Sequence, residues 1–285
     1  MVDYVLQHLD RPLPLGELAR MADFSPFHFH RIFQSLMQET LAQFVKRVRL
    51  ERALKLLVHG PKQSLTEIAL ECGFSSSSDF SRSFKQRYGS PPSSFDLDAF
   101  RDQRRGELDE AMGPESRHRL RHLPAGENPD GFEVTLRKLP ARRVAYLRVL
   151  DPFKPDVVPE AAAKLVQWAE SRDLADGQWL GYMWDDPEIV ALPDCRYDVG
   201  LEIGDTLTEG EIGSFQFPSM LVAEIELRGS IELEMRALDW IWKTWLPNSG
   251  YQPTEQPSFE AWLGRPFAHG FEHFELKLQL PVRRS

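Results

Sequence analysis

Residues 15–95 nearly repeat themselves, and this internal repeat constrains the fold more than any other feature of the chain. The run LGELA at 15–19 aligns with LTEIA at 65–69, an offset of 50 residues, and Phe24-Ser25 aligns with Phe74-Ser75. The offset then becomes 51, and the later matches are Phe29 with Phe80, Arg31 with Arg82, Phe33 with Phe84 and Phe44 with Phe95. A one-residue insertion is typical of a turn between elements. The repeat therefore predicts two copies of a two-element unit.

Each copy is predicted to form two helices joined by a tight turn. Apolar residues follow helical spacing on both sides of the first turn, at 23–26, where Ser25 is a good N-cap and Pro26 a good first helical residue. The second copy begins with Ser64 and Glu67, which are spaced as a capping box. Helix pairs of this kind bury one shared face and leave the second helix free to enter a groove of DNA.

A spacer between the copies, residues 41–57, is predicted to be one continuous helix of about 25 Å. Such a helix could hold two recognition helices about one DNA turn, or ~34 Å, apart. The net charge of the chain is −9, but residues 1–106 have a net charge of +3 and the remainder −12. This asymmetry favours an acidic polymer as the partner of the first half. The alternative is that these basic residues form ordinary solvated helix faces.

The run LTEIALECGFSSSSDFSRSFKQRYGSPPSSF at 65–95 is similar to the signature of the AraC family, and residues 15–95 resemble the DNA-binding domain of AraC-family transcription regulators. The resemblance implies two helix-turn-helix units on one face of double-stranded DNA, and RNA polymerase as a further partner. The candidate DNA contacts are Phe27, His30, Arg31, Arg49, Ser77, Ser78, Asp79 and Arg82.

Several of these side chains suit base recognition. Arginine can pair with guanine O6 and N7, and Phe27 could pack on a thymine methyl group. Asp79 could accept from cytosine N4 or orient Arg82, whereas the two serines discriminate bases poorly. The alternative for each residue is a phosphate contact or no contact.

The length of 285 residues and the hydrophobic content of 42% favour two globular domains. No apolar run reaches 18 residues, and the N-terminus lacks a signal peptide pattern, so we expect a cytoplasmic protein without membrane contact. Cys72 and Cys195 do not support a disulfide framework.

We predict an α+β protein with an all-α double helix-turn-helix domain at 1–100, a charged linker at 101–131 and a second domain at 132–285. The linker has few apolar residues, and it could contain a helical turn or more. In the second domain, strand and helix periods alternate as two β-α-β-β units. This order predicts a duplicated βαββ antiparallel sheet with both helices on one face. The predicted segments are strands at 144–149, 178–184, 196–203, 220–227, 259–263 and 274–280, and helices at 159–174 and 232–245.

The second domain resembles the GyrI-like effector-binding domain, which occurs fused to AraC-type domains. The residues that support the match are Trp184-Asp185-Asp186-Pro187, Cys195-Arg196-Tyr197-Asp198, Phe259-Glu260-Ala261-Trp262 and Leu280-Pro281-Val282. The resemblance implies a pocket for a small-molecule effector, with a glutamate at the strand position of Glu260.

Glu260 lies in an otherwise apolar strand, and Trp262 shares its face because strand side chains alternate. A carboxylate among aromatic rings suits a cationic aromatic or a hydrophobic ligand. All seven tryptophans fall in this half, and the alternative is that most of them are plain core. The candidate ligand-binding residues are Tyr182, Trp184, Trp245, Glu260 and Trp262.

No cofactor or metal site is expected. The pairs His28/His30, His118/His122 and His269/His273 lack a convincing ligand set. The favoured interpretation is a ligand-responsive transcription regulator that is not an enzyme. The alternatives are a GyrI-like hydrolase of reactive xenobiotics that uses the pocket glutamate, and a protein that sequesters a toxic ligand or a protein partner.

Overall fold

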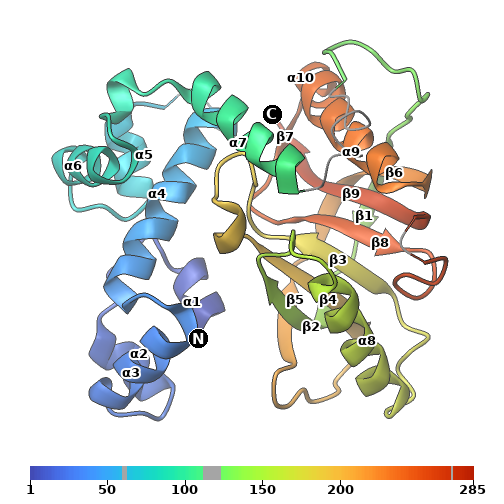
Figure 1. Ribbon diagram of the computed structural model, residues 1–285, viewed down its shortest axis with the longest axis horizontal. Helices are drawn as coiled ribbons and strands as arrows, with labels where there is room; N and C mark the ends of the chain where they lie inside the picture. Colours follow the sequence, from blue (N-terminus) through green and yellow to red (C-terminus); the bar gives the residue numbers. More distant parts are fainter. Residues whose placement is uncertain (60–62, 112–122, 271) are drawn as a thin grey trace. The chain divides into compact units, whose positions relative to one another are not determined.

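The computed structural model describes residues 1–59, 63–111, 123–270 and 272–285. The chain divides into two compact units, Met1–Asp102 and Gln103–Ser285, and the division falls inside helix α7 (Leu97–Ala111) (Figure 1). The predicted class, α+β with two domains, is confirmed. Within the described ranges, no helix combines the length and the apolar composition that a membrane span requires.

The first unit is all-α and contains the two predicted helix pairs. Their helices are α2 (Leu15–Met21) with α3 (Pro26–Met37), and α5 (Leu65–Glu71) with α6 (Ser77–Tyr88). The spacer is helix α4 (Leu41–His59); α1 (Val2–Gln7) precedes the pairs and a short turn, η1 (Pro92–Ser94), follows them.

The predicted caps are present in both pairs. The hydroxyl of Ser25 accepts a hydrogen bond of 3.2 Å from the backbone N–H of His28, so α3 begins at Pro26. At α5, Ser64 and Glu67 form the complete capping box, with each side chain accepting from the other residue's backbone N–H. Helix α6 is also capped by a serine, Ser76. The local sequence therefore determines where three of these four helices begin.

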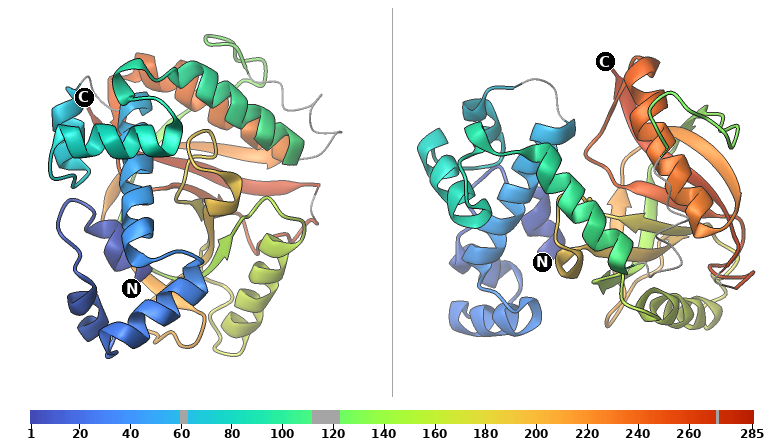
Figure 2. Two further views of the ribbon diagram at one scale, coloured as in Figure 1. Left: turned by 60° about the vertical axis from the view of Figure 1, so that its left-hand side comes forward. Right: turned by 45° about the horizontal axis from the view of Figure 1, so that its top comes forward.

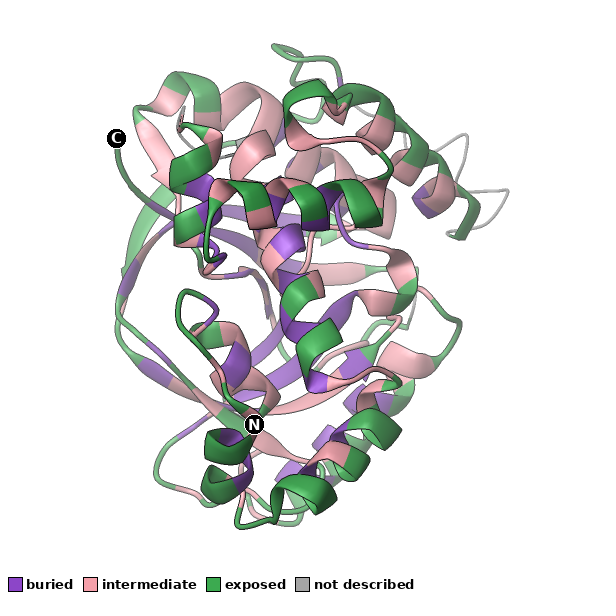
Figure 3. Cartoon of the chain, turned by 90° about the vertical axis from the view of Figure 1, so that its left-hand side faces the viewer, coloured by how far each residue is buried: buried purple, intermediate pink, exposed green. Residues whose placement is uncertain are grey.

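Equivalent phenylalanines of the repeat form the cores of the two pairs. Phe33 is buried and meets Phe44 of α4 at a ring distance of 5.5 Å. Its counterpart Phe84 is fully buried and meets Phe95 at 5.1 Å. Buried and exposed faces alternate along these helices (Figure 3), so the sequence repeat is also a structural repeat.

The second unit is a large antiparallel sheet with helices against it (Figures 1 and 2). In the described residues the strand order is β1-β6-β9-β8-β3-β4-β2-β5, with β7 paired to β9. The strands are β1 (Thr135–Leu139), β2 (Arg142–Leu150), β3 (Trp179–Met183), β4 (Arg196–Ile203), β5 (Gly213–Phe217), β6 (Met220–Gly229), β7 (Tyr251–Pro253), β8 (Ser258–Trp262) and β9 (Phe274–Arg284). The helices are α8 (Val157–Glu170), α9 (Ile231–Trp240) and α10 (Leu246–Ser249), with a π-helical turn η4 (Ile241–Trp245) and a 3-10 turn η3 (Leu192–Asp194).

The order of pairing confirms two βαββ units that meet at β3 and β8. The first is β2-α8-β3-β4 and the second is β6-α9-β8-β9. Strands β1 and β5 extend the sheet at its two ends.

Register shows that α8 and α9 cover the same face. Directly paired residues of neighbouring strands point to the same side of a sheet. Trp179, which packs in the α8 cluster, is two residues from Gly181, and Gly181 pairs with Glu260. Glu260 in turn pairs with Leu278, which packs in the α9 cluster. Glu260 therefore lies on the helix-covered face, at the junction of the two units.

Three strands and the short helix α10 were not predicted, and the linker prediction allowed a helical turn or more without placing a long helix. Strands β1, β5 and β7 were missed, and α7 occupies part of the stretch interpreted as a linker, 101–131. In the same stretch Leu123 is buried in the α9 cluster. Residues 112–122, with His118 and His122, lie outside the described residues, and the domain boundaries remain a prediction.

Candidate functional site

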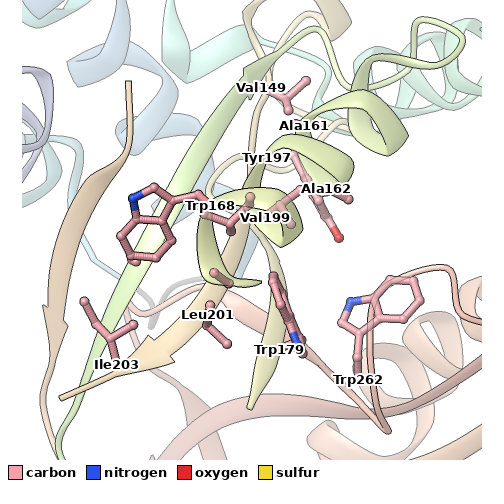
Figure 4. Close-up of a cluster of buried hydrophobic side chains, with 13 residues drawn as sticks. Val149, Ala161, Ala162, Trp168, Trp179, Tyr197, Val199, Leu201, Ile203 and Trp262 are labelled. Atoms are coloured by element: carbon pink, nitrogen blue, oxygen red, sulfur yellow. The ribbon is translucent and has the colours of Figure 1, made fainter. Parts of the chain in front are cut away.

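The first candidate site lies at the junction of the βαββ units and is centred on Glu260. Strand alternation sends Phe259 and Ala261 into a cluster on the sheet face away from the helices, as predicted. Trp262 joins Glu260 on the helix-covered face. Trp262 is buried among the side chains of the α8 cluster (Figure 4). It packs against Phe267 and Phe274, at ring distances of 5.1 and 5.6 Å.

Tyr197 of β4 is the hydrogen-bond partner of Glu260. Its hydroxyl donates to Oε2 of Glu260 at 2.5 Å, a distance typical of a charge-assisted bond. The glycine of the intervening strand, Gly181, makes this contact possible. A Cβ atom at Gly181 would lie 1.9 Å from the Tyr197 hydroxyl and 2.6 Å from Glu260 Oε2. The Tyr197–Glu260 pair therefore occupies the space that a side chain at position 181 would fill.

Burial adjusts the protonation of this pair. Desolvation raises the pKa of Glu260 to about 7, although the hydrogen bond from Tyr197 acts in the opposite direction. Burial, and then the charge of Glu260, raise the pKa of Tyr197 well above its ordinary value. The tyrosine therefore remains a proton donor, and the carboxyl group titrates near neutral pH.

A second carboxyl group, Glu234 of α9, belongs to the same site and was missed from the sequence. It is 5% exposed, and its pKa is raised well above the ordinary value by burial and by the charge of Glu260. Its position gave a signal, because Glu234 lies three residues before Ala237 and seven before Ile241, on the buried side of α9. An acid in an apolar stripe is unusual enough to be a candidate.

The remaining predicted ligand-binding residues lie elsewhere. Tyr182 and Trp184 belong to the cluster on the opposite face of the sheet, with Phe259. There the Trp184 indole donates to Asp198 at 2.7 Å. The structure therefore does not bring Tyr182 and Trp184 together with Glu260. Trp245 lies in the π-helical turn and stacks on Tyr251 at the border of the α9 cluster.

The second candidate site is the exposed face of the two recognition helices, α3 and α6. On α3, the Phe27 side chain is 70% exposed, and the Arg31 guanidinium lies over its ring at 5.8 Å. Arg31 is exposed and His30 is half-buried. Phe27 and Arg31, which were predicted separately as DNA contacts, thus lie together on the surface.

On α6 the predicted residues form a polar group near the start of the helix. Asp79 accepts a hydrogen bond from the Ser75 hydroxyl at 3.0 Å, and Arg82 lies 3.7 Å from its carboxylate. Ser78 is exposed and Ser77 is half-buried. This geometry fits the role of orienting Arg82 that was predicted for Asp79.

Arg49 on α4 has different partners. Its guanidinium donates to the backbone carbonyls of Leu9 and Arg11, at 2.9 and 2.8 Å. These bonds connect α4 to the segment between α1 and α2. The structure gives Arg49 a role within the unit, and its DNA contact remains a prediction.

Metal coordination has no support in the described part of the chain, where no group of three or more His, Cys, Asp or Glu residues could hold an ion. Cys72 and Cys195 are both buried.

Comparisons with known proteins match both units. A model described as a GyrI-like small molecule binding domain matches residues 132–283, and a model described as a helix-turn-helix domain matches residues 18–97. A DNA gyrase inhibitor of Serratia proteamaculans (strain 568) is 31% identical over 150 residues, which are 51% of this chain and 94% of that protein. The probable transcriptional regulator LumQ of Photobacterium leiognathi is 37% identical over 93 residues, which are 33% of this chain and 37% of that protein.

Among solved structures, the DNA-binding domain of AdpA in complex with a target DNA is 32% identical. The match covers 32% of this chain and 82% of that chain, with a TM-score of 0.31.

Proposed function

Because the chain belongs to the family with a GyrI-like small molecule binding domain, here joined to an AraC-type helix-turn-helix region, we propose that it is a transcription regulator controlled by a cationic ligand. The ligand would bind beside Glu260 and change the affinity of the helix-turn-helix units for double-stranded DNA.

The single observation that supports a cation is the lack of a positive partner for Glu260. Among the described residues, its hydrogen-bond partner is the neutral Tyr197, and no Lys, Arg or His lowers its pKa. A buried carboxylate without a counter-ion is costly, and this cost raises the pKa of Glu260 to about 7, so that a substantial fraction of the group is protonated at neutral pH. A cation that replaces this proton would be stabilised by the charge and by the rings around Trp262.

The DNA-binding half of the proposal rests on the paired recognition helices. Phe27 and Arg31 on α3 and Arg82 on α6 present exposed side chains of the type that contacts base edges, and the half-buried Asp79 lies beside Arg82. RNA polymerase is proposed as a further partner, because a regulator acts on the enzyme that transcribes its target. A cytoplasmic location is proposed because the bacterial relatives that this chain resembles include named transcription regulators.

Benzyltrimethylammonium and its neutral isostere neopentylbenzene test the ligand class. The quaternary cation should bind the full-length protein and shift its DNA affinity in a fluorescence anisotropy titration, whereas the neutral compound should not. Glu260→Gln retains the shape of the side chain and should weaken binding of the cation by about 1–2 kcal/mol. Glu133→Gln, at an exposed position before β1, is the matched control. Equal affinity of the wild type and Glu260→Gln for the cation would remove Glu260 from the site.

A second function, hydrolysis, is favoured by one observation. A carboxyl group whose pKa is near 7 is well suited to general acid–base catalysis at neutral pH. Turnover of an electrophilic ligand that is lost in Glu260→Gln would favour this activity over regulation. Ligand binding without turnover and without any change in DNA affinity would favour a sequestering role.

A further inference from the structure

Glu234 and Glu260 come from different elements but face the same interior region. Glu260 pairs in register with Leu278 of β9, and Leu278 packs with Ala237 and Ile241 of α9. Ala237 and Ile241 lie three and seven residues after Glu234, so all three share one side of the helix. Helix α9 therefore directs Glu234 towards the strand pair that contains Glu260.

Neither carboxyl group has a basic partner in the described part of the chain. The nearest titratable neighbours are acids or a phenol: Tyr197 donates to Glu260, while Asp198 points to the opposite face, where Arg148 binds it. Lys243 lies near the end of the same helical segment as Glu234, but it forms an ion pair with Asp239 instead. Two ionised carboxylates here would form an uncompensated charge of −2 in a buried position, which is strongly unfavourable.

A single positive charge could compensate only one of the two groups. With a monocation at Glu260, Glu234 would have to remain protonated or accept an uncompensated charge. A ligand with two positive charges would allow both groups to ionise, because each carboxylate would then have an opposite charge beside it. A metal ion is a poorer occupant, because the described residues offer no third His, Cys, Asp or Glu ligand.

We propose that Glu234 and Glu260 together form a dicarboxylate site that selects dicationic organic ligands over monocations. This inference rests on the proposed function, since it assumes that cations bind beside Glu260. It assigns to Glu234 the role of a specificity-determining residue: Glu260 binds the first charge and Glu234 binds the second.

Xylylene-bis(trimethylammonium), used as its 1,3 and 1,4 isomers, is the matched dication for benzyltrimethylammonium. Quaternary ammonium groups do not titrate, so any proton released on binding comes from the protein. Isothermal titration calorimetry with the full-length chain at pH 7.5 should show at least one isomer binding about tenfold more tightly than the monocation, the equivalent of ~1.4 kcal/mol. Glu234→Gln should remove this advantage and leave the monocation affinity within about twofold. Glu260→Gln should weaken both probes.

The wild type supplies a test that does not depend on folding of the variants. Titrations in two buffers of different ionisation enthalpy measure the protons released on binding, and the dication should release about one proton more than the monocation. Equal proton release, or a dication advantage that persists in Glu234→Gln, would overturn the inference. If the monocation binds through Glu260 and no isomer binds more tightly, only the role of Glu234 fails. If neither probe binds, the proposed cation-sensing function fails together with it.

Discussion

Replacing Glu260 with glutamine should stabilise the second unit at high pH and leave its stability unchanged at low pH. Below its ordinary pKa of 4.5, this carboxyl group is protonated in both the folded and the unfolded protein. Above that value the unfolded chain releases the proton, whereas the folded protein retains it until about pH 7. The free energy of unfolding of the wild type therefore falls as the pH rises through this window.

The magnitude follows from the two pKa values. A carboxyl pKa that increases from 4.5 to about 7 corresponds to about 3 kcal/mol, because each tenfold change in proton affinity is ~1.4 kcal/mol. Glu260→Gln cannot ionise, and its amide oxygen can still accept from Tyr197. The variant should match the wild type near pH 4.5 and exceed it by about 3 kcal/mol at pH 8.

Urea unfolding followed by tryptophan fluorescence measures this difference. All seven tryptophans lie between Trp168 and Trp262, so the signal from the full-length chain reports on the second unit. Glu133→Gln, which changes an exposed carboxyl group, should unfold in parallel with the wild type at every pH. If the curves of Glu260→Gln and wild type also remain parallel from pH 4.5 to 8, Glu260 is not desolvated and the reasoning is refuted.

Three further predictions concern the first unit. Arg31→Ala should weaken DNA binding by about 1–3 kcal/mol and relax selectivity at one base, whereas Ser77→Ala should have a smaller effect. Competition binding to randomised duplexes measures both effects. A larger effect of Ser77→Ala on the preferred site would exchange the roles of α3 and α6. Ser64→Ala removes the capping box of α5 and should destabilise the unit by about 1 kcal/mol in urea unfolding monitored by circular dichroism, with no change counting against the cap. The DNA affinity of the full-length chain should fall with salt, with a log–log slope of about −0.9 per neutralised phosphate, so a flat dependence would contradict groove binding.

Local signals predicted most of the elements. The repeat and the serine caps determined the helix pairs, because a cap satisfies free N–H groups within a few residues of sequence. The alternation of Glu260 and Trp262 with their neighbours also held, because it depends on one strand alone.

Contacts between residues of different strands and helices could not be predicted from such local signals. Alternation shows which residues of one strand share a face, but the face of Tyr182 relative to Glu260 depends on the register between β3 and β8. The apolar stripe of α9 gave a local signal for a buried Glu234, but its proximity to Glu260 could not be predicted because the two residues come from different elements. Strand β1 is almost entirely exposed and lacks an alternating pattern, and α7 is rich in charge with Leu108 as its one buried residue, so both resemble linker sequence.

Gly181 makes the acid–tyrosine pair recognisable in a sequence. Because any side chain at this position would collide with the Tyr197 hydroxyl, a change at Gly181 disables the pair without altering either of its members. Glycine, tyrosine and glutamate at these three positions are therefore expected to be inherited or lost together. If the proposed ligand site is correct, that combination should distinguish chains of this architecture that bind a ligand at the pair from chains that share only the fold.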